Sequence, residues 1–239
     1  MPTPTILLIP GFWEGPTVYT ELATLLTTAG YPVETPALPS TGTLSPGNPT
    51  MKDDIAALRA AISRLVARGD SVVLVLHSAG GFLGSEAMQG LARGEGGGGG
   101  GGGVIGIVFL AAAVFPEGFA HAPVPFAVVA GGASYCANPE ELLFGDLEEE
   151  EQRKWVAVLR AQPAKGWDGT VEYAGWRDVP SVYLVCEGDR ALPVGLQEQL
   201  AATAGSRVER CSAGHVPQVG QPERVAQVVL GAVAEFTRS

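Results

Sequence analysis

Short apolar runs separated by helical patterns constrain the fold of this 239-residue chain more than any other feature. The runs SVVLVL (71–76) and VIGIVFLAA (104–112) are continuously apolar, which is typical of parallel strands buried on both faces. The alternation predicts an α/β fold with a doubly wound, mostly parallel sheet of about six strands. We expect strands at 5–9, 31–38, 71–76, 104–112, 181–186 and 206–211, and helices at 17–29, 52–67, 80–92, 195–204 and 222–236.

Two segments interrupt this alternation. Residues 116–179 lack the strand rhythm and hold three of the four tryptophans. Their run DLEEEEQRKWVAVLRAQP has acids first and basic residues later, the charge order that favours a helix. We therefore expect a helical cap, or lid, over 116–179, inserted between the two parts of a core at 1–115 and 180–239. The second interruption, GEGGGGGGGG at 94–103, has no side chains to pack and predicts a flexible surface loop.

Charge and apolar content limit the partners of the chain. The formal net charge of -10 and the pI near 4.8 would repel nucleic-acid phosphates and anionic membrane surfaces. No apolar run approaches the roughly 18–20 residues that span a bilayer, and the first run, TILLIPG, has no basic region of a signal peptide before it. The three cysteines are an odd number, which suits a reducing compartment. We expect a soluble, cytoplasmic protein with a small-molecule partner; a homodimer is compatible with the sequence.

The strand expected at 71–76 ends in the sequence Leu-His-Ser-Ala-Gly-Gly. A serine in a tight turn between a parallel strand and a helix is held clear of the sheet, and small neighbours let the backbone bend without a clash. The pattern is close to Gly-x-Ser-x-Gly, with Leu76 in place of the first glycine. Alone, it is equally compatible with Ser78 as an ordinary helix N-cap. Partner residues elsewhere decide between these interpretations.

Two residues after later strands complete the order Ser, Asp, His. Asp189 follows the strand expected at 181–186, and His215 follows the strand expected at 206–211. Functional groups of open parallel sheets gather at the carboxyl ends of the strands, so we expect all three residues at one edge. A serine hydroxyl needs an imidazole to remove its proton, and the imidazole needs a carboxylate to fix its tautomer. The sequence predicts Ser78 as nucleophile, His215 as base and Asp189 as orienting acid.

The other histidines and carboxylates are weaker candidates. His77 precedes the serine on the strand, where alternation points it away and favours a structural role. His121 starts the expected cap and either lines the pocket or lies in solvent. Glu187 would face away from Asp189, and Asp146 and Asp168 lack a strand-end position.

The turn IPGFWEG after the first strand supplies donors for a developing oxyanion. Gly11 permits a turn that presents the amide N–H of Phe12, and the amide N–H of Ala79 lies at the helix start after the serine. Phe12 and Trp13 are either core aromatics or an apolar wall beside the substrate. We expect a substrate pocket lined by Gly11, Trp13, His121, Trp155 and Trp176. No metal or cofactor is expected, because the cysteines lack metal-type spacing and the glycine run lacks the Lys and Ser/Thr of a phosphate loop.

On these residues the chain resembles the α/β-hydrolase superfamily over nearly its whole length, the expected cap included. The oxyanion turn directly after the first strand, CEGDRALP (186–193) and GHVPQVGQPERVA (214–226) resemble most the compact branch of methylesterases and hydroxynitrile lyases. The resemblance implies catalytic roles for Ser78, His215 and Asp189, with the Phe12 and Ala79 amides as oxyanion donors.

The chain departs from that branch at three positions. The branch usually has His-Gly after the first strand, where this chain has Pro10 and Gly11, and a glycine where this chain has Leu76. Its hydroxynitrile lyases carry a lysine directly after the histidine, where this chain has Val216, so cyanohydrin cleavage is disfavoured. Dehalogenases and epoxide hydrolases of the superfamily have an aspartate where this chain has Ser78, which argues against both activities.

These features predict a cofactor-free serine hydrolase that cleaves carboxylic esters through an acyl-enzyme. The tryptophans of the expected cap favour a small apolar or aromatic metabolite, such as a methyl ester or a lactone. Two alternatives use the same residues. One is a carbon–carbon lyase, or another non-hydrolytic enzyme, in which His215 acts mainly as acid and base. The other is a ligand-binding receptor that retains the triad without turnover.

Overall fold

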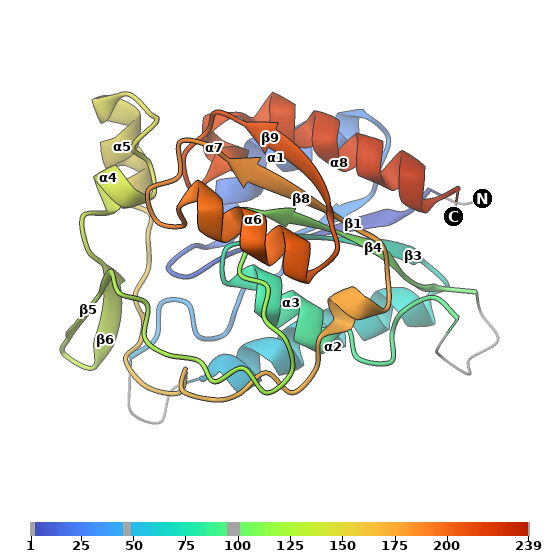
Figure 1. Cartoon of the computed structure of the whole chain (residues 1–239), viewed down its shortest axis with the longest axis horizontal. Coiled ribbons are helices and arrows are strands. Elements are labelled where there is room, and N and C mark those ends of the chain that lie inside the picture. The colour runs from blue at the N-terminus through green and yellow to red at the C-terminus, as the bar shows by residue number, and fades with distance from the viewer. Residues whose placement is uncertain (1–2, 45–48, 95–100, 239) are drawn as a thin grey trace.

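A computed structural model describes residues 3–44, 49–94 and 101–238, and a six-stranded parallel sheet forms its centre (Figure 1). The strands are β1 (Thr5–Ile9), β2 (Val33–Glu34), β3 (Ser71–His77), β4 (Gly103–Leu110), β8 (Ser181–Cys186) and β9 (Arg207–Cys211). Their order is β2-β1-β3-β4-β8-β9, and every neighbouring pair is parallel. The chain thus winds from β1 first to one edge and then to the other, which confirms the predicted doubly wound α/β sheet.

Helices cover both faces of this sheet (Figure 1). On one face lie α1 (Thr20–Thr28) and α8 (Pro222–Phe236); on the other lie α2 (Met51–Ala67), α3 (Gly80–Ala87) and α6 (Val194–Thr203). Alternate residues of each strand feed two separate buried clusters, one under each helical layer. In β1, Ile6 packs in the cluster of α1 and α8, whereas Leu7 packs in the cluster of α2, α3 and α6. Because both sides are apolar, the central strands are continuous apolar runs in the sequence.

Three elements differ from their expected extents. β2 has two residues instead of eight, because Pro32 and Pro36 flank it and proline cannot donate to a strand ladder. α3 ends at Ala87 rather than at residue 92, because Ala92 forms a bridge with Val104 of β4. The helix expected from residue 17 begins as a 3₁₀ turn, η1 (Pro16–Tyr19), and the short helix α7 (Pro217–Gly220), which was not expected, precedes α8.

The glycine-rich stretch lies mostly outside the described residues, which omit 95–100. Its last residue, Gly103, belongs to β4 rather than to the expected loop, and its N–H donates to the carbonyl oxygen of Asp70 (2.9 Å). A Cβ at Gly103 would lie 2.6 Å from the Cα of Arg93, so only glycine fits this close approach.

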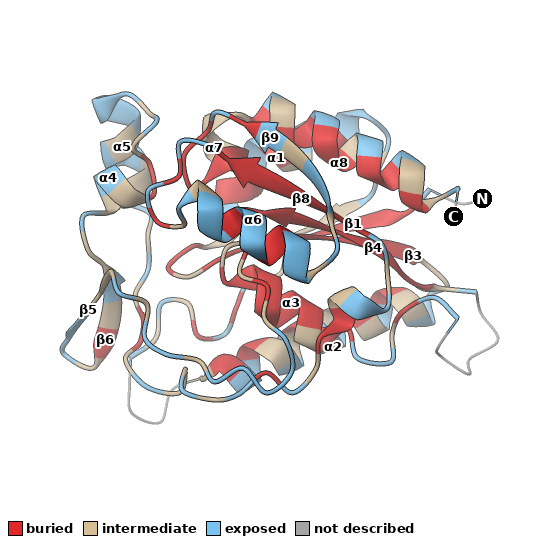
Figure 2. Cartoon of the chain, in the orientation of Figure 1, coloured by how far each residue is buried: buried red, intermediate tan, exposed pale blue. Residues whose placement is uncertain are grey.

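We expected a helical cap over 116–179, but the segment contains strands as well as helices. It holds the antiparallel strands β5 (Ala127–Ala130), β6 (Ala133–Cys136) and β7 (Gln162–Pro163), with α4 (Pro139–Leu142), α5 (Glu149–Val156) and the turn η2 (Gly175–Arg177). α5 ends at Val156, because the end of the expected helical run pairs with β6 as β7 instead. Figure 2 shows this segment largely exposed, beside a buried sheet. Within the described ranges, no helix is long and apolar enough to cross a membrane.

Candidate active site

A sharp turn between β3 and α3 carries Ser78. The serine has a φ of 50°, in the left-handed region that residues with a side chain rarely adopt. Its N–H donates to the carbonyl oxygen of Leu110 (3.2 Å), and its own carbonyl oxygen accepts from the N–H of Ala113 (2.9 Å). These two bonds tie the turn to the end of β4. The serine hydroxyl is thereby held at the carboxyl edge of the sheet.

Glycines make room for this turn. A Cβ at Gly81 would lie 2.4 Å from the carbonyl oxygen of Ala113, and one at Gly80 would lie 2.7 Å from the carbonyl oxygens of Ile9 and Pro10, at the end of β1. Leu76, which replaces the usual first glycine, fits because it faces Gly84: a Cβ at Gly84 would lie 2.5 Å from the Leu76 side chain. The chain therefore accommodates Leu76 by having a glycine, Gly84, one helical turn after Gly80 in α3.

Ser78, His215 and Asp189, which follow three different strands, are connected by hydrogen bonds. The Oγ of Ser78 lies 2.9 Å from Nε2 of His215, and Nδ1 of His215 lies 2.8 Å from Oδ2 of Asp189. His215 and Asp189 are buried. A carboxylate on Nδ1 fixes the tautomer in which Nε2 can accept the serine proton. Residues separated by 137 positions in the chain thus meet in a geometry suited to nucleophilic attack.

The carboxylate of Asp189 is fully bonded. Its Oδ1 accepts from the amide N–H groups of Ala191 (2.7 Å) and Leu192 (2.8 Å). Its Oδ2, which faces His215, also accepts from the amide of Gln197 at 3.4 Å. These donors hold the carboxylate in one orientation.

The basicity of His215 reflects two opposing effects. Burial favours the neutral imidazole and lowers its pKa, whereas the charge and hydrogen bond of Asp189 favour the imidazolium. The net effect raises the pKa of His215 above the usual histidine value. A more basic imidazole is a better proton acceptor from a serine hydroxyl.

The backbone amides expected to bind an oxyanion are those of Phe12 and Ala79. Gly11 packs directly on the serine, since a Cβ there would lie 2.7 Å from the Cβ and 3.2 Å from the Oγ of Ser78. Phe12 follows Gly11, and Ala79 follows the serine. Neither the Phe12 nor the Ala79 amide donates a hydrogen bond to another described residue. Both N–H groups are therefore free to bind a ligand oxygen beside the nucleophile.

The expected pocket residues lie in different places. Trp13 is buried and ties the oxyanion turn to the 116–179 segment, because its indole N–H donates to the carbonyl oxygen of Ser134 (3.0 Å). The indole N–H of Trp176 donates to the carbonyl oxygen of Phe115 (3.2 Å). Within the described chain, no hydrogen bond or ring contact joins Trp155 or Trp176 to the serine. Gly11, by contrast, lies directly against the serine.

Four aromatic residues form a chain of ring contacts that includes Phe12 of the oxyanion turn, which we call the aromatic face: Phe12, Phe82, His121 and Trp167. The ring of Phe12 lies 4.6 Å from Trp167 and 6.3 Å from Phe82, and Phe82 lies 4.4 Å from His121. Nε2 of His121 and Nε1 of Trp167 are buried without a hydrogen-bond partner among the described residues. Burial also lowers the pKa of His121, which favours its neutral form. Phe82, four residues after Ser78, could have been found from helical spacing; Trp167 had no such signal.

Glu14 is an acid inside the otherwise apolar oxyanion turn, and no sequence motif indicated a role for it. Its carboxylate is buried and accepts from the N–H of Gly11 (3.1 Å). It also contacts His77, which has the structural role expected from strand alternation.

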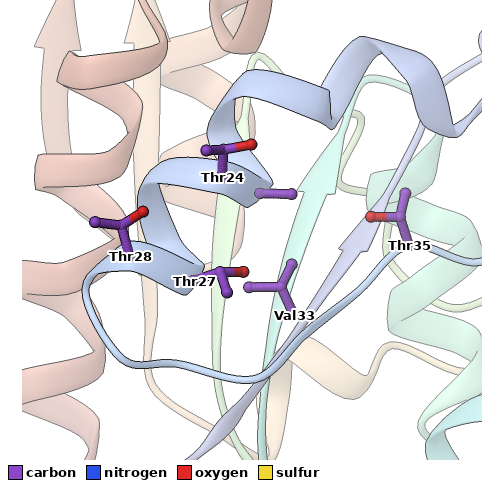
Figure 3. A pocket seen from close by; sticks show the side chains of 6 residues that line it. Thr24, Thr27, Thr28, Val33 and Thr35 are labelled. Atoms are coloured by element: carbon purple, nitrogen blue, oxygen red, sulfur yellow. The ribbon is translucent and has the colours of Figure 1, made fainter.

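An open groove lies away from the serine, on another part of the sheet. It has a volume of about 320 Å³ between α1 and β2 and is lined by small apolar residues and threonines (Figure 3). Its lining residues are Ala23, Thr24, Thr27, Thr28, Val33 and Thr35. With no acid, base or activated nucleophile, this groove offers no site for catalysis. In the described part of the chain, no cluster of three or more His, Cys, Asp or Glu could hold a metal ion.

Known proteins resemble this chain over nearly its whole length. The chain is 29% identical to alpha/beta hydrolase nvfD of Aspergillus novofumigatus over 250 residues, covering 97% of each protein. It is 25% identical to the probable hydrolase R7 of a Phoma species, covering 96% of this chain and 98% of that protein.

Solved structures share the fold at low identity. A pyrethroid hydrolase from Sphingobium faniae superposes with a TM-score of 0.76 at 20% identity, covering 99% of this chain and 100% of that one. Methylesterase MES16 from Arabidopsis gives 0.75 at 18% identity, covering 97% and 99%. The model of the alpha/beta hydrolase family matches residues 6–228. The chain therefore belongs to the alpha/beta hydrolase family.

Proposed function

We propose that this protein is a serine hydrolase that cleaves carboxylic esters through an acyl-enzyme. The observation that carries the proposal is the row of Ser78, His215 and Asp189, with contacts of 2.9 and 2.8 Å. Solved structures of the same fold include proteins named as a methylesterase and as polyneuridine aldehyde esterase, which supports ester chemistry.

The proposed reaction follows from the placement of protons. His215 takes the hydroxyl proton as the Ser78 oxygen adds to the ester carbonyl, and the N–H groups of Phe12 and Ala79 bind the resulting oxyanion. The imidazolium, stabilised by Asp189, gives its proton to the leaving alcohol. Water then loses a proton to His215 and attacks the acyl group; the acid leaves as the imidazolium returns the proton to the Ser78 oxygen. Because the base must be neutral, activity should rise with pH through the raised pKa of His215.

The aromatic face supports an aromatic ester as substrate. Unpaired buried donors are rare in folded proteins, since each costs about 1–3 kcal/mol. A substrate ring that stacks on the aromatic face and carries an oxygen acceptor would satisfy Nε1 of Trp167, and a polar substituent would do the same for Nε2 of His121. We therefore infer an aryl ester with at least one oxygen substituent on the ring.

The 116–179 segment is proposed as the cap of this site, on a core of 1–115 and 180–239. Three contacts support this division. Trp13 in the oxyanion turn bonds to Ser134 (3.0 Å), and Arg190, next to the catalytic acid, pairs with Glu141 (3.3 Å). A Cβ at Gly214, next to the catalytic base, would meet the carboxylate of Asp146 at 2.4 Å. The segment thus touches all three parts of the site.

The test is hydrolysis of a panel of short alkyl and aryl esters by wild type and Ser78→Ala. An acyl-enzyme route predicts a loss of roughly 10⁴-fold or more in kcat. Ser212→Ala, at an exposed position near the base, is the matched control and should leave turnover unchanged. Folded wild type that hydrolyses no ester would overturn the proposal. Full activity in Ser78→Ala would point instead to acid-base chemistry by His215.

A further inference from the structure

A buried carboxylate in the oxyanion turn contacts groups from two other parts of the chain. Oε2 of Glu14 lies 3.1 Å from the amide nitrogen of Gly11 and 2.8 Å from Nδ1 of His77. Glu14 is 2% exposed and His77 is 0% exposed, so water does not bond to either group in place of the protein. The same oxygen must therefore serve two nitrogen neighbours.

The opposite nitrogen of His77 reaches the catalytic base. Nε2 lies 2.7 Å from the backbone carbonyl oxygen of His215, and the two imidazole rings are 5.1 Å apart. His77 also directly precedes Ser78. One imidazole thus connects the oxyanion turn, the nucleophile and the base, although it touches no reacting atom.

These contacts fix the number of protons on the pair. A carbonyl oxygen only accepts, so Nε2 of His77 must carry a hydrogen that it donates to His215. A second hydrogen must lie between Nδ1 and Oε2 of Glu14, because two bare acceptors at 2.8 Å would repel each other. The pair is either imidazolium with carboxylate or imidazole with carboxylic acid. In both forms its net charge is zero.

We propose that Glu14 and His77 are positioning residues: a neutral, proton-sharing pair that holds the oxyanion amides in register with the catalytic base. This inference rests on the proposed hydrolase function. The pair acts through the backbone of Gly11 on one side and the backbone of His215 on the other. Glu14 lies only two residues after Phe12, whose amide is a proposed oxyanion donor, so a shift of the turn moves that amide relative to the serine.

The chemistry of glutamine makes Glu14→Gln a sharp test. The atom at the Oε2 position must accept from the N–H of Gly11 and also share a hydrogen with Nδ1 of His77, whose Nε2 keeps its own hydrogen. A glutamine oxygen there would leave a buried imidazolium without a counter-ion, and a glutamine nitrogen there would oppose the Gly11 N–H. No orientation of the amide satisfies both neighbours, although glutamine has nearly the same shape as glutamate.

We expect Glu14→Gln to lower kcat on an ester substrate by about 10- to 100-fold, the effect of a misplaced reacting group, with KM changed less than about threefold. His77→Gln should give a similar loss. Because both variants disrupt the same pair, kcat of the double variant should fall no further than kcat of the more impaired single variant. The matched control is Glu187→Gln, an exposed carboxylate two residues before Asp189, which should leave kcat unchanged. Unchanged kcat in folded Glu14→Gln, or losses that multiply in the double variant, would overturn the pairing.

A measurement on the wild-type protein keeps the inference testable if the variants fail to fold. Nitrogen NMR of ¹⁵N-histidine-labelled protein should show Nε2 of His77 protonated, with a slowly exchanging hydrogen, from pH 6 to 8. A bare Nε2 would contradict the pair directly. This readout needs no turnover, so a protonated Nε2 in a protein that cleaves no ester would leave the pair standing and remove only the proposed function.

Discussion

The central sheet and the 116–179 segment of this chain differ in how far their strands are buried. Every residue of β3, β4 and β8 is buried, whereas none of β5 is, and Val129 in β5 is 63% exposed. The sheet is held by apolar packing on both faces. The segment contributes Leu143 and Phe144 to one of these apolar clusters, and its polar contacts with the core include Trp13 with Ser134 and Ser40 with Gln162.

The two regions contribute different groups to the proposed site. The rigid sheet ends hold the groups that must stay within hydrogen-bond distance of one another: Ser78, Asp189 and His215. The more exposed segment supplies His121 and Trp167, to which the proposed function assigns contacts with the substrate. Exposed side chains can change without loss of the core, so substrate preference is expected to depend on the segment and reactivity on the sheet.

The largest expected effect separates two aspartates, one in each region. Asp189→Asn should lower kcat/KM by about 10³- to 10⁴-fold, because an amide next to Nδ1 of His215 favours the wrong tautomer. Asp168→Asn, in the exposed part of the segment, should leave kcat/KM within about twofold of wild type. Steady-state hydrolysis of one ester by both variants makes the comparison, and equal losses would contradict it.

The second prediction compares two glycines by stability. Gly81→Ala in the serine turn should destabilise the fold by about 3 kcal/mol or more, because its Cβ would lie 2.4 Å from the backbone oxygen of Ala113. Gly118→Ala in the segment has no atom within 4 Å of its Cβ, so only its φ of 81° opposes the change, at about 1 kcal/mol. Urea unfolding of both variants measures the difference. A larger loss at Gly118 would show that the segment is as tightly packed as the sheet.

The third prediction concerns the joint between the two regions. Asp54 of α2 is buried and bonds to Ser40, which also bonds to Gln162 of β7. Burial raises the pKa of Asp54 to about 6, against the lowering effect of its hydrogen bonds to Ser40. Since the folded protein binds this proton more tightly than the unfolded chain, its stabilising effect is complete below pH 4. It is lost as pH rises from about 4 through 6.

Asp54→Asn removes this titration. Relative to wild type, the variant should gain up to about 3 kcal/mol of unfolding free energy between pH 4 and pH 7, at about 1.4 kcal/mol per pKa unit. Denaturation of both proteins across this range checks the sign. A stability difference independent of pH would mean that Asp54 titrates normally in the folded state.

The smallest expected effect tests recognition by the segment. Trp167→Phe keeps an aromatic ring and removes only the unpaired N–H, so kcat/KM should fall about five- to tenfold for aryl esters with an oxygen substituent and stay unchanged for those without. Trp176→Phe is the matched control, because its N–H already bonds to Phe115. It should lower stability and affect all substrates alike. Equal effects of Trp167→Phe on both substrate classes would remove the inferred hydrogen bond.

The same contrast explains what the sequence could predict. β1, β8 and α8 lie at their expected ranges, because buried strands and amphipathic helices leave a local apolar pattern. β5 and β6 were missed because exposed four-residue strands leave none. Because functional groups gather at the carboxyl ends of parallel strands, the positions of Ser78, Asp189 and His215 after three strands predicted that they lie close together. Glu14 could not be placed, because its direction depends on the left-handed backbone of Trp13 (φ 65°) just before it.

The most direct measurement of the central claim is the site of covalent capture. Wild-type protein treated with a fluorophosphonate should gain one adduct, and peptide mass spectrometry should place it on Ser78. The rate of labelling should fall steeply in His215→Gln, since the hydroxyl then lacks its base. An adduct on another residue, or equal labelling rates with and without His215, would contradict an activated serine at this turn.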